Sequence, residues 1–378
     1  MLLDPSPDQE FFRDTTSRFL MNRVPVAEIR RLRHDPAGFG AEYWRSGAEL
    51  GWTSLLAGEE AGGGSIGEHG LVDLTLVAYE FGTHAAPGPL VPTNVVADVL
   101  GRYTDAHADT LGALAEGSAT AAWCFEEARR GSRTTSDAVE IRVEGEHVVL
   151  RGTKRPVEAA VSADFLLVAG RTGDGLSQVL VPSGTPGVRI TPLKSIDITR
   201  RYAAVEFDDV RLPVTALVGA AGGAAADVER ALQVGAVLVS AESVGALQAA
   251  FDLTVAWAFD RYSFGRPLAS YQELKHRFAD MKMWLEASHA ISDSAAEAVA
   301  TQADDAPELV SAAKAYIGHY GGELFQDCVQ IHGGIGITFE HDLHLFARRG
   351  AANRSNYGTP AEHRARIADI VEYQEANR

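Results

Sequence analysis

The feature that most constrains the fold is a change of residue pattern in the middle of the chain, over residues 117–218. Short runs rich in β-branched and aromatic residues follow one another there, a pattern typical of strands. Turn residues such as Gly145 and the Pro186-Gly187 pair separate these runs. The predicted strands are Ala121–Phe125, Val139–Val143, His147–Leu150, Phe165–Ala169, Gln178–Val181, Val188–Pro192 and Ala203–Phe207. So many short strands in so little sequence predict a compact β-barrel or sandwich.

Both flanks of this block have helical patterns instead. In the N-terminal flank, apolar residues recur at helical spacing, as Phe12 and Phe19 do. A helix is also predicted over Leu71–Phe81, and three prolines that follow, at positions 87, 89 and 92, are expected to break the chain. Three long helical patterns in the C-terminal flank cover Ala224–Asp260, Leu268–Thr301 and Pro307–Ile331. Long helices with apolar stripes and short connections predict an antiparallel bundle.

The sequence therefore predicts an α+β multi-domain fold. We expect an N-terminal helical domain over residues 1–116, a middle β-barrel domain over residues 117–218 and a C-terminal four-helix bundle over residues 219–378. The chain has 378 residues, of which 46% are hydrophobic and 22% charged. This composition gives ample core for two or three domains.

Charge and cysteine content exclude several classes of function. The formal net charge of −17 argues against nucleic acid and anionic membranes as partners. The first residues lack the apolar core of a signal peptide, and we find no run of about 18 apolar residues that predicts a membrane span. The two cysteines, Cys124 and Cys328, have no metal-ligand spacing. We therefore expect no metal site, no disulfide framework and a cytoplasmic location.

Two stretches in the C-terminal region carry the most specific motifs. Arg261–Met281 reads RYSFGRPLASYQELKHRFADM, and Gln330–Thr338 reads QIHGGIGIT. An arginine fork matches phosphate geometry and stays charged, and paired glycines let a backbone approach a ligand where a Cβ atom would clash. Taken alone, R-x-x-F-G also suits a helix end, and a single histidine such as His332 is usually packed. The two motifs in this order are much more specific than either one.

These motifs, with the helix–strand–helix order, resemble the acyl-CoA dehydrogenase family over nearly the whole chain. The resemblance implies FAD as cofactor and an assembly of four subunits. In that family an arginine contacts the flavin diphosphate and a glycine segment lies against the adenosine half, each acting on a neighbouring subunit's cofactor. The residues that the resemblance assigns to this half are Arg261, Phe264, Gln272, Gln330, Gly333, Gly334 and Thr359.

The family's reaction needs a carboxylate that this sequence lacks at both usual positions. The reaction is α,β-dehydrogenation of an acyl thioester, in which a desolvated glutamate removes the α-proton. The resemblance places Tyr357 at one glutamate position and Gly235 at the other. Glu242 is a weak candidate, because seven residues along a helix displace it by about 10.5 Å, whereas a base must come within about 3 Å of its proton. Glu229, six residues before Gly235, faces the same objection.

The residues expected beside the flavin ring are also altered. The family's Thr-Glu-Pro-x-x-Gly-Ser-Asp motif corresponds to residues 126–133. Gly131 and Ser132 are retained there and are predicted cofactor contacts, but Glu126 replaces the threonine. Pro156 occupies the region of the family's flavin-stacking tryptophan. A carboxylate near the pyrimidine carbonyls opposes the reduced, anionic flavin.

The substitutions are thus confined to one half of the expected cofactor site, and three hypotheses follow. The first is a base-less subunit of a mixed tetramer, paired with a homologous acyl-CoA dehydrogenase subunit. The second is an active homotetrameric enzyme with an unusual base. The third is a non-catalytic module that binds an acyl thioester. The resemblance further implies an acyl-CoA or acyl-carrier thioester as substrate and an electron-transfer flavoprotein as partner; the sequence leaves the acyl group and its carrier open.

Overall fold

The N-terminal domain is helical, as predicted. A computed structural model of the chain describes residues 5–58, 62–127 and 137–376. Its first helices are α1 (Pro7–Arg23), α2 (Val26–Leu32), α3 (Ala41–Glu49), α4 (Gly70–Thr83), α5 (Leu90–Leu100) and α6 (Thr104–Ala115). The start of α1 follows from its sequence, because the Ser6 hydroxyl accepts from the Gln9 amide and the Gln9 side chain accepts from the Ser6 amide.

One local expectation for this domain was wrong. Pro92 does not break the chain but lies in the first turn of α5, which begins at Leu90. Proline is tolerated there because the amide groups of a first helical turn have no partner within the helix. The helix is predominantly apolar and buried along its whole length, and it crosses the interior of the molecule beside β1.

The middle domain contains every predicted strand. These are β1 (Ala121–Cys124), β2 (Val139–Glu144), β3 (His147–Glu158), β4 (Phe165–Thr172), β5 (Gly175–Pro182), β6 (Val188–Leu193) and β7 (Tyr202–Pro213), with a short β8 (Leu217–Val218). They form one mixed sheet in the order β6-β7-β3-β2-β4-β5-β8, and β1 pairs with β4 in parallel. Alternating residues from these strands, such as Val139, Ile141, Val148 and Leu150, share one interior core. The sheet therefore curls around its own core, as a barrel-like domain does.

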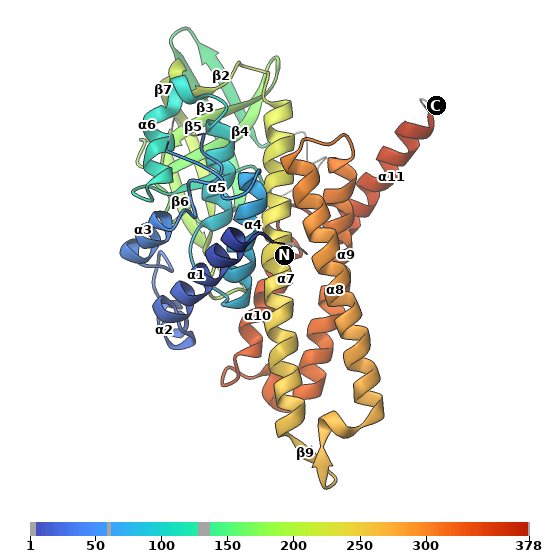
Figure 1. The fold of residues 1–378 in the computed structure, drawn as a ribbon. Helices are drawn as coiled ribbons and strands as arrows, with labels where there is room; N and C mark the ends of the chain where they lie inside the picture. The colour runs from blue at the N-terminus through green and yellow to red at the C-terminus, as the bar shows by residue number, and fades with distance from the viewer. Residues whose placement is uncertain (1–4, 59–61, 128–136, 377–378) are drawn as a thin grey trace.

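The C-terminal domain is a helical bundle organised around one long helix. Its helices are α7 (Ala225–Asp260), α8 (Gln272–Ala300), α9 (Ala306–His332), α10 (Leu343–Asn353) and α11 (Pro360–Ala376). Figure 1 shows that α7 runs between the N-terminal helices and the rest of the bundle, and it packs against α4, α8, α9 and α10. In the described part of the chain, α7 is the one helix long and apolar enough to cross a membrane, and 89% of that apolar stretch is buried within the protein.

A small hairpin links α7 to α8 at the far end of the bundle (Figure 1). It consists of β9 (Tyr262–Ser263) and β10 (Arg266–Pro267), with Phe264 and Gly265 at the turn. Both turn residues have positive φ angles, 50° and 79°, which suit a two-residue hairpin turn. This hairpin is the first part of the Arg261–Met281 stretch that the sequence singles out.

Candidate functional site: a filled ring-side pocket and an exposed distal end

The two positions expected to carry the base lie face to face in space. Gly235 is on α7, and Tyr357 is in the connection between α10 and α11. A Cβ atom built on Gly235 would lie 2.1 Å from the Cε1 atom of Tyr357, far inside van der Waals contact. The tyrosine ring thus occupies the space that any other residue at position 235 would need. The two substitutions are therefore spatially complementary.

Tyr357 also belongs to an aromatic stack. Its ring lies 6.2 Å from that of Trp123 with an interplanar angle of 14°, and Trp123 stacks on Phe125 at 4.7 Å. The indole of Trp123 donates to the Gln178 side chain over 3.1 Å, which fixes the middle of the stack. Burial raises the pKa of Tyr357 well above its usual value. The phenol is therefore neutral at physiological pH and is a poor proton acceptor.

A pocket opens beside this stack, and we call it the ring-side pocket. Its lining residues are Pro92, Trp123, Phe125, Glu126, Glu127, Pro156, Glu158, Tyr202, Ser355, Asn356 and Tyr357. The substituted residues Glu126, Pro156 and Tyr357 all line it, so the structure brings the predicted ring-side changes together. Glu127 makes an ion pair of 2.6 Å with Lys154, which is fully buried. The predicted contacts Gly131 and Ser132 lie outside the described residues.

Sequence reasoning missed one carboxylate in this pocket. Glu158 lies at the end of β3, and its side chain is 11% exposed. Burial raises the pKa of Glu158, while the nearby Arg200 guanidinium, 2.7 Å away, acts in the opposite direction. The sequence contained one signal for this carboxylate. Glu158 comes two residues after Pro156, and alternate residues of a strand lie on the same face.

Glu242, the weak candidate for the base, lies in a buried network of charges and not in the ring-side pocket. Its carboxylate, 1% exposed, accepts from Arg200, from Arg349 over 2.5 Å and from the Asn353 amide over 2.9 Å. Each oxygen therefore already has at least one protein donor. This network joins α7 to α10 and to the loop before β7.

The same network contains a third carboxylate, Asp197. Arg349 donates to it over 2.6 Å. Burial alone would raise the pKa of Asp197, but the attraction of Arg349 and Arg200 holds that pKa below its usual value. The other carboxylate considered on α7, Glu229, pairs instead with Arg366 of α11. Neither Glu229 nor Glu242 lines the ring-side pocket.

The predicted adenosine-half residues gather at the opposite end of the bundle, which we call the distal end. Arg261 follows the last residue of α7, Gln272 begins α8, and Gln330 lies in the last turn of α9. Trp257 near the end of α7 stacks on His332 near the end of α9, with ring centroids 5.2 Å apart, and so holds the two motifs together. Gly235 and Asp260 are 25 residues apart on α7, so the two ends are separated by roughly 37 Å.

The distal end is open toward solvent. The Phe264 side chain is 98% exposed, and a Cβ atom built on Gly333 or Gly334 would meet no other heavy atom within 4 Å. The glycine segment forms a 3₁₀ turn (Gly333–Ile337) in which Gly333 and Gly334 are exposed and Gly336 is buried. These residues fit a phosphate-bearing ligand held from one side by an arginine and from the other by bare backbone.

Thr359 does not belong to the distal end. It caps α11, where its hydroxyl donates to Glu362 over 2.7 Å, and it lies two residues after Tyr357. The structure therefore groups Thr359 with the ring-side residues. Among the described residues, no group of three His, Cys, Asp or Glu side chains is placed to hold a metal ion.

FAD therefore fits the two ends differently. Bound FAD supplies the hydride acceptor in this type of chemistry. The distal end offers a cation and accessible backbone, which suit the diphosphate and adenosine. The ring-side pocket presents the carboxylates of Glu126 and Glu158, which would oppose the negative charge of a reduced flavin there, and Tyr357 lines the same pocket.

The chain matches known families over most of its length. Residues 222–371 match the family described as acyl-CoA dehydrogenase, C-terminal domain, and residues 6–118 match acyl-CoA dehydrogenase, N-terminal domain. Acyl-CoA dehydrogenase IpdE2 of Mycobacterium tuberculosis is 27% identical over 375 residues, which cover 98% of this chain and 99% of the relative.

Solved structures share the fold. A putative acyl-CoA dehydrogenase from Mycobacterium smegmatis superimposes with a TM-score of 0.90 at 25% identity, covering 98% of this chain and 99% of that one. The Tcur3481-Tcur3483 steroid ACAD variant does so with a TM-score of 0.88 at 25% identity, covering 97% and 98% of the two chains. The chain belongs to the acyl-CoA dehydrogenase family of FAD-dependent oxidoreductases.

Proposed function

We propose that this chain is the base-less subunit of a mixed tetramer that dehydrogenates an acyl thioester. The observation that carries the proposal is the contact between Gly235 and Tyr357. Both usual positions for the base are occupied by a pair of residues that fit each other and cannot accept the α-proton. The chain would serve the complex through its distal end, where Arg261 and the Gln330 segment complete the flavin site of the partner.

The network around Glu242 supports the same proposal. A general base must lie within hydrogen-bond reach of its proton and be free to accept it. The Glu242 carboxylate accepts from two guanidinium groups and an amide, and is not in the ring-side pocket. Its role is therefore to join the helical bundle to the middle domain.

The comparisons suggest the chemical class of the substrate. A relative that covers nearly the whole chain is IpdE2, and a structural neighbour is a steroid ACAD. We infer that the substrate is a steroid-derived or other lipid acyl thioester, carried by coenzyme A. An electron-transfer flavoprotein would reoxidise the flavin, and the reaction would take place in the cytoplasm.

The test is to assay the chain alone and with a homologous subunit that carries an intact glutamate. We expect negligible dye-linked dehydrogenation for the chain alone and turnover for the mixture. Replacing the partner's glutamate by glutamine should abolish that turnover, whereas Glu242→Gln in this chain should leave turnover per bound flavin within about twofold. Turnover by the chain alone would contradict the proposal.

One observation favours a second candidate, an active homotetramer with Glu158 as an unusual base. Glu158 lines the ring-side pocket, and burial raises its pKa, as a general base at neutral pH requires. Against this, its carboxylate is already paired with Arg200 at 2.7 Å. If the chain alone were active, loss of turnover in Glu158→Gln with flavin retained would establish this candidate.

A further inference from the structure

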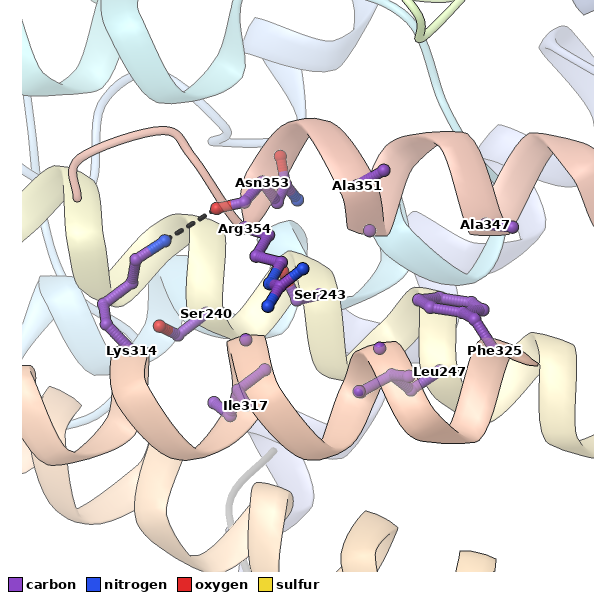
Figure 2. A pocket seen from close by; sticks show the side chains of 14 residues that line it. Ser240, Ser243, Leu247, Lys314, Ile317, Phe325, Ala347, Ala351, Asn353 and Arg354 are labelled. Atoms are coloured by element: carbon purple, nitrogen blue, oxygen red, sulfur yellow. Dashed lines mark hydrogen bonds between the residues drawn. The ribbon is translucent and has the colours of Figure 1, made fainter. Parts of the chain in front are cut away.

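A second cavity lies between α7, α9 and α10, and we call it the interhelical cavity. Its volume is about 160 Å³, and it shares no lining residue with the ring-side pocket. Figure 2 shows α9 and α10 as its two walls, with α7 behind them. An apolar cavity of about 150 Å³ in another protein holds benzene, so this one has room for about six carbon atoms.

Small residues keep the gap between α9 and α10 open. Those that line the cavity are Gly318, Gly321, Gly322, Ala347, Gly350 and Ala351. A Cβ atom built on Gly322 would have no heavy atom within 4 Å, so that glycine faces empty space. Neighbouring helices usually fill such a gap with interlocking side chains. Here Phe325 packs on Gly350 and Leu247 on Gly321, where an added Cβ atom would lie 2.2 and 3.1 Å from those side chains, and the space beside Gly322 remains open.

The inner part of the cavity is apolar. Leu247 on α7 and Ile317 and Phe325 on α9 line it, and each is at most 8% exposed. Ser240 and Ser243 contribute hydroxyl groups that already donate to carbonyls one helical turn earlier. Because these hydroxyl protons are used, the serines add little that would attract an anion. This part suits an alkyl chain.

The opposite end of the cavity is positively charged. Arg354, just after α10, extends across the opening in Figure 2, and its guanidinium makes no hydrogen bond or ion pair with any described residue. Its stem lies close to α9, since a Cβ atom on Gly318 would come within 3.4 Å of the Arg354 Cγ atom. The buried ammonium of Lys314 also lines this end and donates to the carbonyls of Asn353 and Asn356.

No acidic side chain is among the described residues that line the cavity. A guanidinium at one end and an apolar interior at the other match a carboxylate with a short alkyl tail. Phosphate alone would leave the apolar part unfilled, and a neutral hydrocarbon would make no use of the Arg354 guanidinium at the exposed edge of the cavity.

We propose that the interhelical cavity binds a small aliphatic carboxylate, with its head group on Arg354 and a tail of about six carbon atoms against Leu247, Ile317 and Phe325. This site lies beside the connection that carries Tyr357, but it is separate from the ring-side pocket. The proposal does not depend on the presence of flavin or of a partner subunit.

The test is calorimetric titration of hexanoate into the full-length chain as purified. For a ligand of this size we expect a dissociation constant on the order of 1 mM. Two further probes separate the contributions of charge and tail. Hexan-1-ol, which lacks the charge, should bind at least tenfold more weakly, and acetate, which lacks the tail, should give no measurable binding at the same concentrations.

Two variants locate the site. Arg354→Gln should weaken hexanoate binding at least tenfold, whereas Arg364→Gln, which removes the same charge from an exposed position on α11, should leave it unchanged. Gly322→Leu should fill the cavity and abolish binding without lowering the midpoint of thermal unfolding, since its Cβ meets no neighbour. No binding of hexanoate by the folded chain, equal binding of hexan-1-ol, or full binding by either cavity variant would overturn the proposal.

Discussion

The ring-side pocket and the distal end lie near opposite ends of the same helix, yet they differ in almost every physical respect. At the ring side, Gly235 and Tyr357 fill each other's space, and the nearby charges pair among themselves. At the distal end, Phe264 is almost fully exposed, and two glycines present bare backbone. At the ring side, Tyr357 packs directly against α7, whereas the distal end leaves a side chain and backbone exposed to solvent.

This difference explains why only one half of the family's cofactor site is altered. If, as we propose, the flavin ring is held by the partner, side chains that pack well can fill this pocket, because packing adds stability. A surface that must accept a neighbour's ligand has to remain open. Changes at the ring side should therefore affect the free energy of unfolding, and changes at the distal end should affect flavin binding.

The largest effect is expected from Glu242→Leu. Removing this carboxylate leaves Arg200 and Arg349 buried with one partner fewer, and breaking a buried ion pair costs about 3–5 kcal/mol of unfolding free energy. Chemical denaturation measures this loss. Glu229→Leu, on the same helix but 29% exposed, is the matched control and should cost about 1 kcal/mol or less. Equal losses of unfolding free energy in the two variants would show that the buried network around Glu242 does not stabilise the fold more than an exposed ion pair does.

Arg261→Ala should lower the flavin content of the mixed complex and not the stability of this chain. A charge-assisted hydrogen bond to phosphate contributes roughly 1.5–3 kcal/mol, so the flavin dissociation constant should rise about tenfold or more. Arg266→Ala is the control, since Arg266 lies in the same hairpin over the Tyr271 ring at 3.9 Å. Unchanged flavin occupancy in Arg261→Ala would show that this arginine does not bind the flavin diphosphate.

Gly235→Ala tests the fit between α7 and Tyr357. The added Cβ atom would clash with the ring, and overpacking of this kind costs about 1–3 kcal/mol of unfolding free energy. Adding the same change to a Tyr357→Ala chain should cost much less, since the ring is gone. A double-mutant cycle measures the coupling, and strictly additive effects would show that the two residues do not share the space.

The smallest effect on stability is expected for Phe264→Ser. The side chain is 98% exposed, and surface changes of this kind usually alter the free energy of unfolding by less than about 0.5 kcal/mol. The same variant should still weaken assembly with the partner subunit, measured by size-exclusion chromatography with light scattering. A large loss of stability in the chain alone would place Phe264 in the fold and not at an interface.

The elements of regular structure were readable from the sequence, because each depends on a local pattern. The long helices match their apolar periodicity to within a few residues, and all predicted strands are present. The prediction for Pro92 was wrong because a proline breaks a helix in its interior but is tolerated in its first turn, and α5 begins at Leu90. The predicted strand ended at Leu150, whereas β3 continues to Glu158, so the face that Glu158 shares with Pro156 was overlooked.

The site was predictable only where a motif is contiguous. Arg261 and the Gln330 segment each lie in one stretch, and the stack of Trp257 on His332 joins them because α7 and α9 run in the same direction, each antiparallel to α8. Glu242 and its donors Arg200 and Arg349 are 42 and 107 residues apart. The resemblance assigned Gly235 and Tyr357 to the two positions of the base, but only three-dimensional packing shows that the tyrosine ring occupies the space beside the glycine.

We propose that the flavin ring is held by the partner and not by this chain. The direct measurement is the number of flavins per chain, from absorbance and protein concentration, for the chain alone and for the mixed tetramer. We predict little flavin in the chain alone and one flavin for every two chains in the mixture. A yellow homotetramer with close to one flavin per chain, which bleaches when an acyl-CoA is added, would contradict the account.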